Sequence, residues 1–290
     1  MSLTEINLRE KNFHNDLQSK KKSRFENIFY KALHNMFEDF NLIISKKANQ
    51  KIVLDYGCGV GSVTEKIAKS NPKRLVGVDI SEVSIDKAVQ SAKNLNFKIE
   101  YLIDNCENLK LKEKTFDLVF GSGILHHLNM EKAINEISKV LKDDGEMVFI
   151  EPLGTNPIIN FYRKLTPNSR SVDEHPFIKK DFDLINSLFK NVKINYYGFF
   201  TLAFFLFYIK PEKSLLFKIL CKLDNYFFKI KNFKYFAWSV LIIAKKKLSS
   251  VFLFSNKTLV AFGKIRDYIA DFKIILINRC NWRYFCCGSG

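Results

Sequence analysis

The sequence is poor in the features that mark secreted and membrane-spanning proteins. Its 290 residues include only 6 cysteines, and their irregular spacing fits a reducing compartment better than a disulfide framework. No secretory signal is visible in the N-terminal stretch MSLTEINLREKNFHNDL, which is polar and mixed in charge. The longest apolar run is Phe199–Ile209, with Thr201 inside it, and it is too short to span a bilayer. We therefore expect a cytoplasmic protein.

Metal-binding and lipid-attachment patterns are also absent. Cys280, Cys286 and Cys287 lack the paired spacing of a zinc site, and no histidine lies near them in the sequence. Cys287 is fourth from the end, but the two residues after it are not the aliphatic pair that a prenylation motif needs. No metal is expected, and residues 248–290 are interpreted as a C-terminal tail to which the sequence assigns no role.

Positive charge is abundant and unevenly distributed. The chain carries 46 Lys and Arg against 30 Asp and Glu, a net charge of +16. Residues 210–290 hold 16 basic and 4 acidic residues, so +12 lies there and +4 lies in residues 1–209. A basic surface would explain this imbalance, and so would the general abundance of lysine that an AT-rich genome produces. Charge alone indicates non-specific attraction and leaves both explanations open.

The most informative stretch is KIVLDYGCGVGSVT, residues 51–64. It begins with a short aliphatic run that ends at Asp55, as in a strand buried on both faces. Gly57, Gly59 and Gly61 follow, and apolar residues then recur at helical intervals. The glycines therefore occupy a strand-to-helix turn, where the backbone must turn sharply and let a ligand approach without a Cβ in the way.

Two other kinds of glycine-rich turn do not fit this stretch. A phosphate loop needs Lys followed by Ser or Thr after its last glycine, whereas Ser62 and Val63 follow Gly61. A dinucleotide-binding turn has two residues between its second and third glycines, whereas only Val60 separates Gly59 from Gly61.

The pattern Asp55-x-Gly57-x-Gly59-x-Gly61 resembles motif I of the class I S-adenosylmethionine-dependent methyltransferases, and in particular their type 11 and quinone-methyltransferase-like members. A second apolar strand ends in Asp79, about twenty positions further on, where a carboxylate can accept hydrogen bonds from both ribose hydroxyls. The match is strong because further landmarks follow in order and at the spacing of the family.

Those landmarks are three more strands and two connecting segments, at 99–103, 116–120 and 147–151, and at 104–109 and 141–146. The resemblance is close over residues 50–152 and looser over residues 25–247. It implies an α/β fold with a Rossmann-like, seven-stranded, mostly parallel sheet. The implied strand order is 3-2-1-4-5-7-6, with flanking helices and a helical insertion before the last strand.

The resemblance also implies the cofactor, S-adenosyl-L-methionine, and the residues that hold it. The glycine turn would line the methionine end, the second strand would hold the ribose, the segment after the third strand would flank the adenine, and a residue after the fourth strand would lie beneath the sulfonium. The implied cofactor-binding residues are Asp55, Gly57, Cys58, Gly59, Gly61, Thr64, Asp79, Ile80, Asn105, Cys106 and Ser122.

Residues 1–48 are interpreted as a lead-in followed by a helix, and the methyltransferase domain is expected over residues 49–247. Residues 1–22 are polar and predicted to fray. Apolar residues between Phe25 and Phe40 repeat at three and four, which predicts an amphipathic helix. This helix would cover the sheet, and by the resemblance it would also form a lid over the cofactor and substrate cleft.

Residues 151–177 are predicted to form a long polar loop, of the kind in which substrate contacts collect. Their pattern EPLG…DEHPF resembles a subgroup of uncharacterised bacterial methyltransferases. Glu151 and His175 in this loop, and His127 after the fourth strand, are the candidate catalytic residues if the acceptor must lose a proton. Alternatively, the histidines after the fourth strand only pack and form hydrogen bonds at a helix start.

Residues 198–236 are predicted to be a helical insertion. Apolar residues from Leu215 to Ile230 follow helical spacing, with lysines among them. Such a basic amphipathic helix would either cap the substrate pocket or lie on an anionic membrane surface, at the inner face of the membrane. Both roles favour an apolar or lipid-linked acceptor.

The expected function is methyl transfer from S-adenosylmethionine to the oxygen or carbon of such a small molecule, by positioning and exclusion of water. A nucleic-acid methyltransferase is an alternative, supported only by the basic C-terminal third. The segment Gly121–Ile124 after the fourth strand is not the Asn/Asp-Pro-Pro-aromatic motif used on exocyclic base nitrogens, so nucleic acid is not the expected partner. A non-catalytic S-adenosylmethionine-binding protein is a further alternative.

Overall fold

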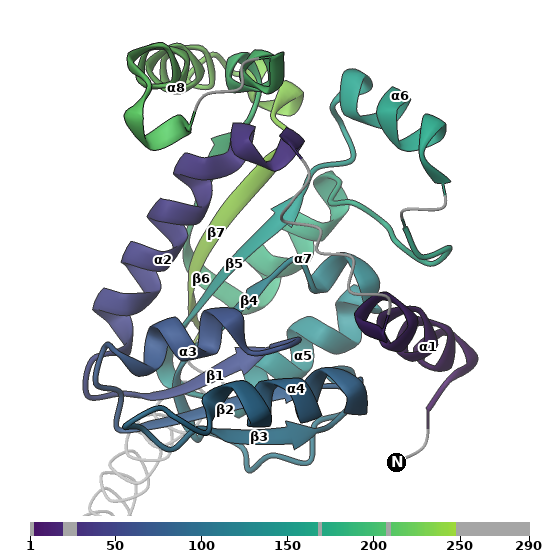
Figure 1. Cartoon of the computed structure of the whole chain (residues 1–290), viewed down its shortest axis with the longest axis vertical. Coiled ribbons are helices and arrows are strands. Elements are labelled where there is room, and N and C mark those ends of the chain that lie inside the picture. Colours follow the sequence, from purple (N-terminus) through teal and green to yellow (C-terminus); the bar gives the residue numbers. More distant parts are fainter. Residues whose placement is uncertain (1–2, 20–27, 168–169, 207–209, 248–290) are drawn as a thin grey trace, which may run out of the picture. The chain divides into compact units, whose positions relative to one another are not determined.

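The computed structural model describes residues 3–19, 28–167, 170–206 and 210–247. Residues 1–247 belong to one compact unit, and the described residues of this unit are drawn in colour in Figure 1. The predicted C-terminal tail, 248–290, and its three cysteines lie outside the described residues.

A seven-stranded sheet forms the centre of the fold, in the order β3-β2-β1-β4-β5-β7-β6. The strands are β1 (Ile52–Tyr56), β2 (Arg74–Asp79), β3 (Glu100–Ile103), β4 (Phe116–Ser122), β5 (Leu141–Pro152), β6 (Phe189–Tyr197) and β7 (Ser239–Lys246). The first five strands pair in parallel, and β7 runs antiparallel to both β5 and β6. The predicted fold class and strand order are confirmed.

Helices connect the strands and cover both faces of the sheet. The α-helices are α1 (Glu5–Ser19), α2 (His34–Ala48), α3 (Ser62–Ala68), α4 (Glu82–Ala92), α5 (Met130–Val140), α6 (Pro157–Leu165), α7 (Lys179–Leu188) and α8 (Leu215–Phe227). Short 3-10 turns are η2 (Ile28–Leu33), η3 (Leu125–His127), η5 (Phe200–Leu206), η6 (Pro211–Lys213) and η7 (Phe233–Phe236). None of the helices in the described ranges combines the length and the apolar character needed to cross a bilayer.

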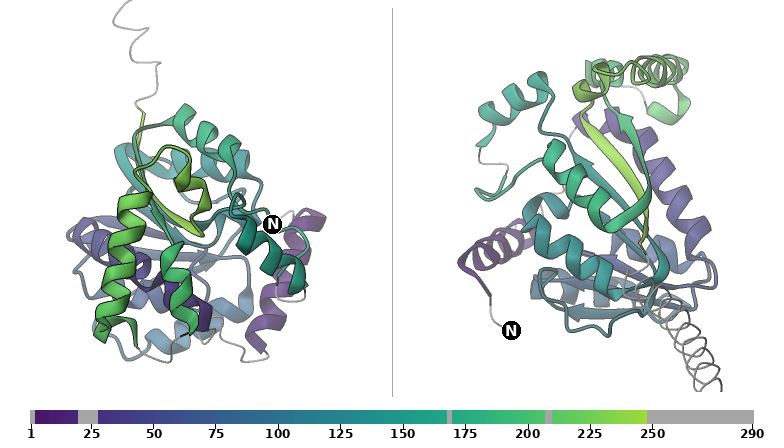
Figure 2. Two further views of the ribbon diagram at one scale, coloured as in Figure 1. Left: turned by 90° about the horizontal axis from the view of Figure 1, so that it is seen from above. Right: turned by 180° about the vertical axis from the view of Figure 1, so that it is seen from behind.

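The core has two parts, one on each face of the sheet. On the face seen in front in Figure 1, Phe40 of α2 and Ile67 of α3 are buried with strand residues. On the face seen from behind in Figure 2, Ile134 of α5 and Ile185 of α7 are buried with other strand residues. Each of these fully buried apolar side chains stabilises the fold by roughly 1.5–3 kcal/mol. Because the helices cover the two faces of the sheet, the carboxyl edge of the parallel strands is where a ligand site can form.

Polar side chains define where two of the site-flanking helices begin. Ser81 Oγ accepts a hydrogen bond from the Ser84 amide at 3.0 Å and so caps the start of α4. Asn129 Oδ1 accepts from the Lys132 amide at the start of α5 in the same way. Caps of this kind are worth about 1 kcal/mol each.

The N-terminal part differs from the prediction in two ways. Residues 5–19 are not a frayed lead-in but the helix α1, whose buried residues are the polar Asn7 and Glu10. The prediction was wrong because α1 buries a polar face, which leaves no apolar periodicity in the sequence. The second helix starts at His34 and continues to Ala48, beyond the predicted end, because the apolar spacing extends through Ile44. Residues 25–27, which open the predicted helix, lie outside the described residues.

Two further segments differ from the prediction. One contains a helix that was not predicted, and the other contains a helix shorter than predicted. The predicted loop 151–177 holds α6, capped by Asn156, whose Oδ1 accepts from the amides of Ile158 and Ile159. The insertion 198–236 is helical, as expected, but its main helix α8 ends at Phe227 rather than continuing along the predicted stripe to Ile230.

Candidate functional site

The glycine turn between β1 and α3 has the backbone that its sequence requires. Gly57, Gly59 and Gly61 have φ angles of 75°, 53° and 78°, in the left-handed region. A Cβ atom on Gly61 would lie 2.4 Å from the Tyr101 hydroxyl oxygen, whereas a Cβ on Gly59 would meet nothing within 4 Å. Gly61 is therefore required by packing, and Gly59 borders open space into which a ligand can approach.

Asp79 at the end of β2 lies beside this turn. One carboxylate oxygen accepts a hydrogen bond from the Gly59 amide at 2.9 Å, and the other accepts from the Ser81 amide at 2.9 Å. Burial raises the pKa of Asp79, while these backbone hydrogen bonds oppose that rise. A carboxylate has about four acceptor positions, so Asp79 keeps acceptor capacity for the two hydroxyls of a ribose.

Asp55 at the end of β1 is the second buried carboxyl of the turn. Its Oδ2 accepts a hydrogen bond from the Thr64 hydroxyl at 2.6 Å. Burial raises the pKa of Asp55 to about 7, against the lowering effect of Thr64. A positively charged ligand group beside Asp55 would favour its ionised form. Thr64 is fully buried and contacts Asp55, which it orients.

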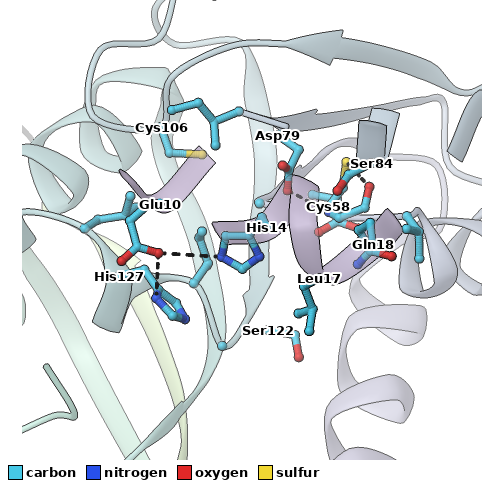
Figure 3. A pocket seen from close by; sticks show the side chains of 18 of the residues that line it. Glu10, His14, Leu17, Gln18, Cys58, Asp79, Ser84, Cys106, Ser122 and His127 are labelled. Carbon is cyan, nitrogen blue, oxygen red and sulfur yellow. Dashed lines mark hydrogen bonds and ion pairs between the residues drawn. The ribbon is translucent and has the colours of Figure 1, made fainter. Parts of the chain in front are cut away.

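A cavity of about 410 Å³ opens at the carboxyl edge of β1, β2 and β4, a size typical of small-molecule and cofactor sites. Figure 3 shows it from close by. The cofactor-site residues predicted from the sequence that line the cavity are Asp55, Gly57, Cys58, Gly59, Asp79, Ile80, Asn105, Cys106 and Ser122. Gly61 and Thr64 are not among the lining residues; they support the turn from behind.

The N-terminal helix α1 forms another wall of the cavity, and the sequence did not predict this wall. The cavity-lining residues of α1 are Asn7, Glu10, His14, Leu17 and Gln18. Polar contacts fasten α1 over the site: Asn105 Nδ2 donates to Asn7 Oδ1 at 3.1 Å, and Ser81 Oγ donates to Asn15 Oδ1 at 2.6 Å. Polar side chains at helical spacing in residues 7–18 were the one signal in the sequence that points to this wall.

Glu10 of α1 contacts His127, which follows β4. Glu10 Oε2 lies 3.1 Å from His127 Nδ1 and 3.7 Å from His14 Nε2, and Figure 3 marks both contacts. The side chains of Glu10 and His127 are only 6% and 2% exposed. Burial raises the pKa of Glu10, but the hydrogen bond and charge of His127 outweigh it, and the net direction is downward.

A second pair of a histidine and a carboxyl lies directly behind the first. His126 Nδ1 lies 2.6 Å from Glu151 Oε2, and the other oxygen of Glu151 accepts from the amides of Ile124 and Leu125. Burial raises the pKa of Glu151 to about 7, while those amide hydrogen bonds lower it. The rings of His126 and His127 lie 4.1 Å apart between centroids.

The three predicted catalytic residues therefore occupy different places. His127 lines the cavity, whereas Glu151 and His175 do not. His175 donates from Nε2 to the Leu128 carbonyl at 2.7 Å, and its amide donates to the His126 carbonyl at 2.8 Å. Glu151 and His175 thus hold the segment that carries His127, from two sides.

Two groups of side chains among the described residues have the chemistry of a metal site. They are Glu10, His14 and His127, and His126, His127 and Glu174, with the ligand atoms of each group within 4.8 Å of one another. Carboxylate and imidazole groups suit several divalent metals. The expectation that no metal takes part stays a prediction.

Comparison with known proteins shows which family part of the chain resembles. Residues 53–145 match a family described as "Methyltransferase domain". Ubiquinone biosynthesis O-methyltransferase of Pelagibacter ubique is 36% identical over 115 residues, which cover 39% of this chain and 47% of that protein. Ubiquinone/menaquinone biosynthesis C-methyltransferase UbiE of Hydrogenovibrio crunogenus is 32% identical over 125 residues, 41% of this chain and 49% of that protein. The chain spans about half the length of these relatives.

A solved structure extends the likeness beyond the matched sequence. Geranyl diphosphate C-methyltransferase from Streptomyces coelicolor A3(2) superimposes with a TM-score of 0.60 over 85% of this chain and 100% of that chain, at 14% identity. At this identity the likeness concerns the fold alone. The glycine turn, Asp79, β2, β3, β4 and all of β1 except Ile52 fall within the residues that match the family. This part of the chain is therefore a class I, S-adenosylmethionine-dependent methyltransferase domain.

Proposed function

We propose that the protein transfers a methyl group from S-adenosylmethionine to an oxygen or carbon atom of an apolar or lipid-linked small molecule. The observation that carries the proposal is the lining of the cavity. Besides the predicted cofactor residues, it contains the apolar Ile124 and Leu128 together with His127. Apolar walls with a few polar groups favour a hydrophobic ligand. Two relatives named as methyltransferases of quinone biosynthesis support the same acceptor class.

The residues of the chain fit the cofactor in position and chemistry. Asp79 would accept the ribose hydroxyls, and Asn105 and Cys106 would flank the adenine. The glycine turn and Asp55 would hold the methionine end, where positive charge favours a nearby carboxylate. S-adenosylmethionine, when bound, supplies an electrophilic methyl group on a sulfonium. The protein then contributes mainly position and the exclusion of water, for which α1 covers the cavity.

His127 is the proposed proton acceptor, for acceptors that must lose a proton. It is the one of the three predicted catalytic residues that lines the cavity, and its Nε2 is buried without a hydrogen-bond partner in the described part of the chain. A buried unpartnered nitrogen is unfavourable until a ligand group satisfies it. We assign Glu151 and His175 the positioning of the backbone around His127. The EPLG…DEHPF pattern supports this assignment, because it supplies both residues.

The test is incubation of the full-length protein with labelled S-adenosylmethionine and the lipid, RNA and polar-metabolite fractions of the source cell. We expect label in the lipid fraction, and none with the variant Asp79→Ala. Label only in the polar fraction would contradict an apolar acceptor. Label in RNA, with binding that weakens steeply with salt, would favour the nucleic-acid alternative. Cofactor binding without transfer to any fraction would indicate a non-catalytic S-adenosylmethionine-binding protein.

The proposal includes contact with an anionic membrane surface through α8. This helix presents its apolar residues outward: Leu215 is 74% exposed and Tyr226 is 67% exposed, and Ile219 is also exposed. Its inward side contains Phe217 and the carboxyl of Asp224, which are buried. A surface helix of a globular protein normally has the opposite arrangement. Within 198–236, no residue that the structure describes lines the cavity, and the alternative role as a substrate cap stays a prediction.

Polar contacts explain why α8 holds this orientation. The Asp224 carboxylate accepts hydrogen bonds from the Phe200 amide at 2.6 Å and the Thr201 hydroxyl at 2.8 Å. This fixes α8 to η5 by a buried acidic group and leaves the apolar stripe facing away. At the same end of the sheet, α6 also exposes Phe161 and Leu165 (Figures 1 and 2).

The charge around the stripe complements anionic lipid. Lys218 and Lys222 on α8, and Lys229 and Lys231 just after it, are exposed, and the one acidic residue of 214–236 is the buried Asp224. Each lysine close to an anionic surface contributes roughly 1 kcal/mol of attraction, and the apolar residues add burial in the headgroup region.

Co-sedimentation with vesicles tests this contact. We expect the full-length protein to bind phosphatidylcholine vesicles that contain phosphatidylglycerol, and not phosphatidylcholine alone. The double variant Leu215→Glu, Ile219→Glu should lose most binding. Leu42→Glu is the matched control, because Leu42 is an exposed leucine on α2, at 54%. Unchanged vesicle binding by the double variant would contradict the proposal, and a raised KM for a soluble acceptor analogue would then favour the cap.

A further inference from the structure

The N-terminal helix carries a side chain that the methyl-transfer proposal has not used. Glu10 is buried on the cavity-facing side of α1, and it lies more than a hundred residues from His127 in the sequence. We propose that Glu10 is a positioning residue that orients His127 and stabilises its protonated form, so that α1 supplies half of a proton-accepting pair. The inference rests on the proposed methyl transfer.

The two ring nitrogens of His127 have different surroundings. Nδ1 lies 3.1 Å from Glu10 Oε2, an ion-pair contact without hydrogen-bond geometry, and 3.4 Å from the Ser171 hydroxyl oxygen, whereas Nε2 has no hydrogen-bond partner among the described residues. The negative charge of the Glu10 carboxylate favours a hydrogen on Nδ1 of His127. The Ser171 hydroxyl favours the same tautomer, because its own hydrogen goes to Glu10 Oε1 and its oxygen can then only accept from Nδ1. That tautomer leaves the lone pair of Nε2 available to take a proton.

The surrounding groups hold Glu10 in place. Ser171 Oγ donates a hydrogen bond to Glu10 Oε1, and Oε2 is left for His127 and His14. The neighbouring charged or titratable groups are His14 on α1, His126 with Glu151 behind it, and Glu174 from the loop. Three separate segments, 5–19, 125–127 and 171–175, therefore meet at one carboxylate.

The proton and the bonds balance in this arrangement. The acceptor oxygen or carbon forms a bond to the methyl carbon, and the carbon–sulfur bond breaks with its electron pair going to sulfur. The proton lost by the acceptor moves to Nε2 of His127. His127 keeps its hydrogen on Nδ1, and the Glu10 carboxylate stabilises the resulting imidazolium without taking a proton itself.

The experiment compares Glu10→Gln with Glu5→Gln, a matched control on the same helix whose side chain is exposed. With the acceptor fraction that takes up label, Glu10→Gln should lower kcat about 10- to 100-fold, a part of the usual effect of a general base. The KM for the acceptor and the Kd for S-adenosylmethionine should stay within about two-fold. Glu5→Gln should match the natural chain in all three values.

A second readout does not depend on activity. Nitrogen-15 NMR of the imidazoles, with His127 assigned from the variant His127→Asn, reports which ring nitrogen carries the hydrogen. We expect the Nδ1–H tautomer in the natural chain, and loss of that preference in Glu10→Ala. If cofactor binding and this preference are present but no acceptor is methylated, the proposed function fails and the pairing stands.

Three outcomes would overturn the inference. The first is an unchanged kcat in Glu10→Gln, and the second is the same tautomer preference in the natural chain and in Glu10→Ala. The third is a requirement for a divalent cation, with activity lost after EDTA and restored by Zn²⁺ or Mg²⁺, and with His14→Ala as inactive as Glu10→Ala. That result would assign Glu10, His14 and His127 to a metal instead of a proton.

Discussion

The two sides of the cavity are built in different ways. On the cofactor side, Asp55, Gly59 and Asp79 lie within 25 positions of one another, and backbone amides hold the Asp79 carboxylate. At the wall formed by α1, Glu10 interacts through its side chain with Ser171, a residue 161 positions away that does not itself line the cavity. A site made by one turn depends on local backbone geometry, whereas a site made by distant segments depends on how the whole domain packs.

The largest expected effect is on the cofactor side. Asp79→Ala removes the proposed acceptor of two ribose hydroxyls and the partner of the Gly59 and Ser81 amides. Because hydrogen bonds to charged groups contribute roughly 1.5–3 kcal/mol each, the affinity for S-adenosylmethionine should fall about 100-fold or more. Isothermal titration calorimetry measures it, with Asp86→Ala, an exposed aspartate on α4, as the control. Equal affinity of both variants would place the ribose elsewhere.

Substitutions at two glycines of the same turn should distinguish a residue needed for cofactor binding from one needed for packing. Gly61→Ala combines a positive φ with a contact of 2.4 Å to Tyr101, so we expect a loss of about 2–4 kcal/mol in the free energy of unfolding. Gly59→Ala meets no protein atom and should lose only about 1 kcal/mol, while cofactor affinity falls at least about ten-fold. Chemical denaturation and calorimetry on both variants check this. The reverse order of stabilities would contradict the assignment of Gly59 to the ligand.

The smallest expected effect concerns two buried carboxyls, Asp55 beside the glycine turn and Glu151 beside His126. Burial raises both pKa values to about 7. Between the pKa of the unfolded chain, about 4, and about 7, the folded protein holds protons that the unfolded chain has released, so stability falls as pH rises. The free energy of unfolding should drop by roughly 1–3 kcal/mol per group from about pH 5 to about pH 8.

Single substitutions assign that pH dependence. Asp55→Asn and Glu151→Gln should each flatten part of the slope, as measured by denaturant unfolding of the cofactor-free protein across the same pH range. If stability rose with pH in the natural chain and neither substitution changed it, the two carboxyls would be ionised in the folded state and the argument from burial would be wrong.

Much of the fold was predictable because its signals are local. The run from Ile52 to Leu54, the glycines after it and the apolar strand ending at Asp79 follow each other in one βαβ unit, whose crossover allows few arrangements. The spacing of these landmarks carried the resemblance to the family, and that resemblance implied the strand order. Helix ends were less accurate, as the extension of α2 to Ala48 shows, because apolar spacing marks a face and not a terminus.

The sequence by itself determined the glycine turn and the carboxylate that flanks it, since both depend on neighbours within one βαβ crossover, and the sheet order followed from the resemblance to the methyltransferase family. Only the tertiary structure decided which of His127 and His175 faces the cavity and that α1 closes it. Residues 1–22 carry no apolar stripe, so the sequence did not predict the contact of Glu10 with His127. Only folding brings Glu10 Oε2 to 3.1 Å from His127 Nδ1. The outward orientation of the apolar side of α8 also depends on tertiary structure. Helical spacing in the sequence predicts an apolar stripe, but the hydrogen bonds of Asp224 determine which way that stripe faces.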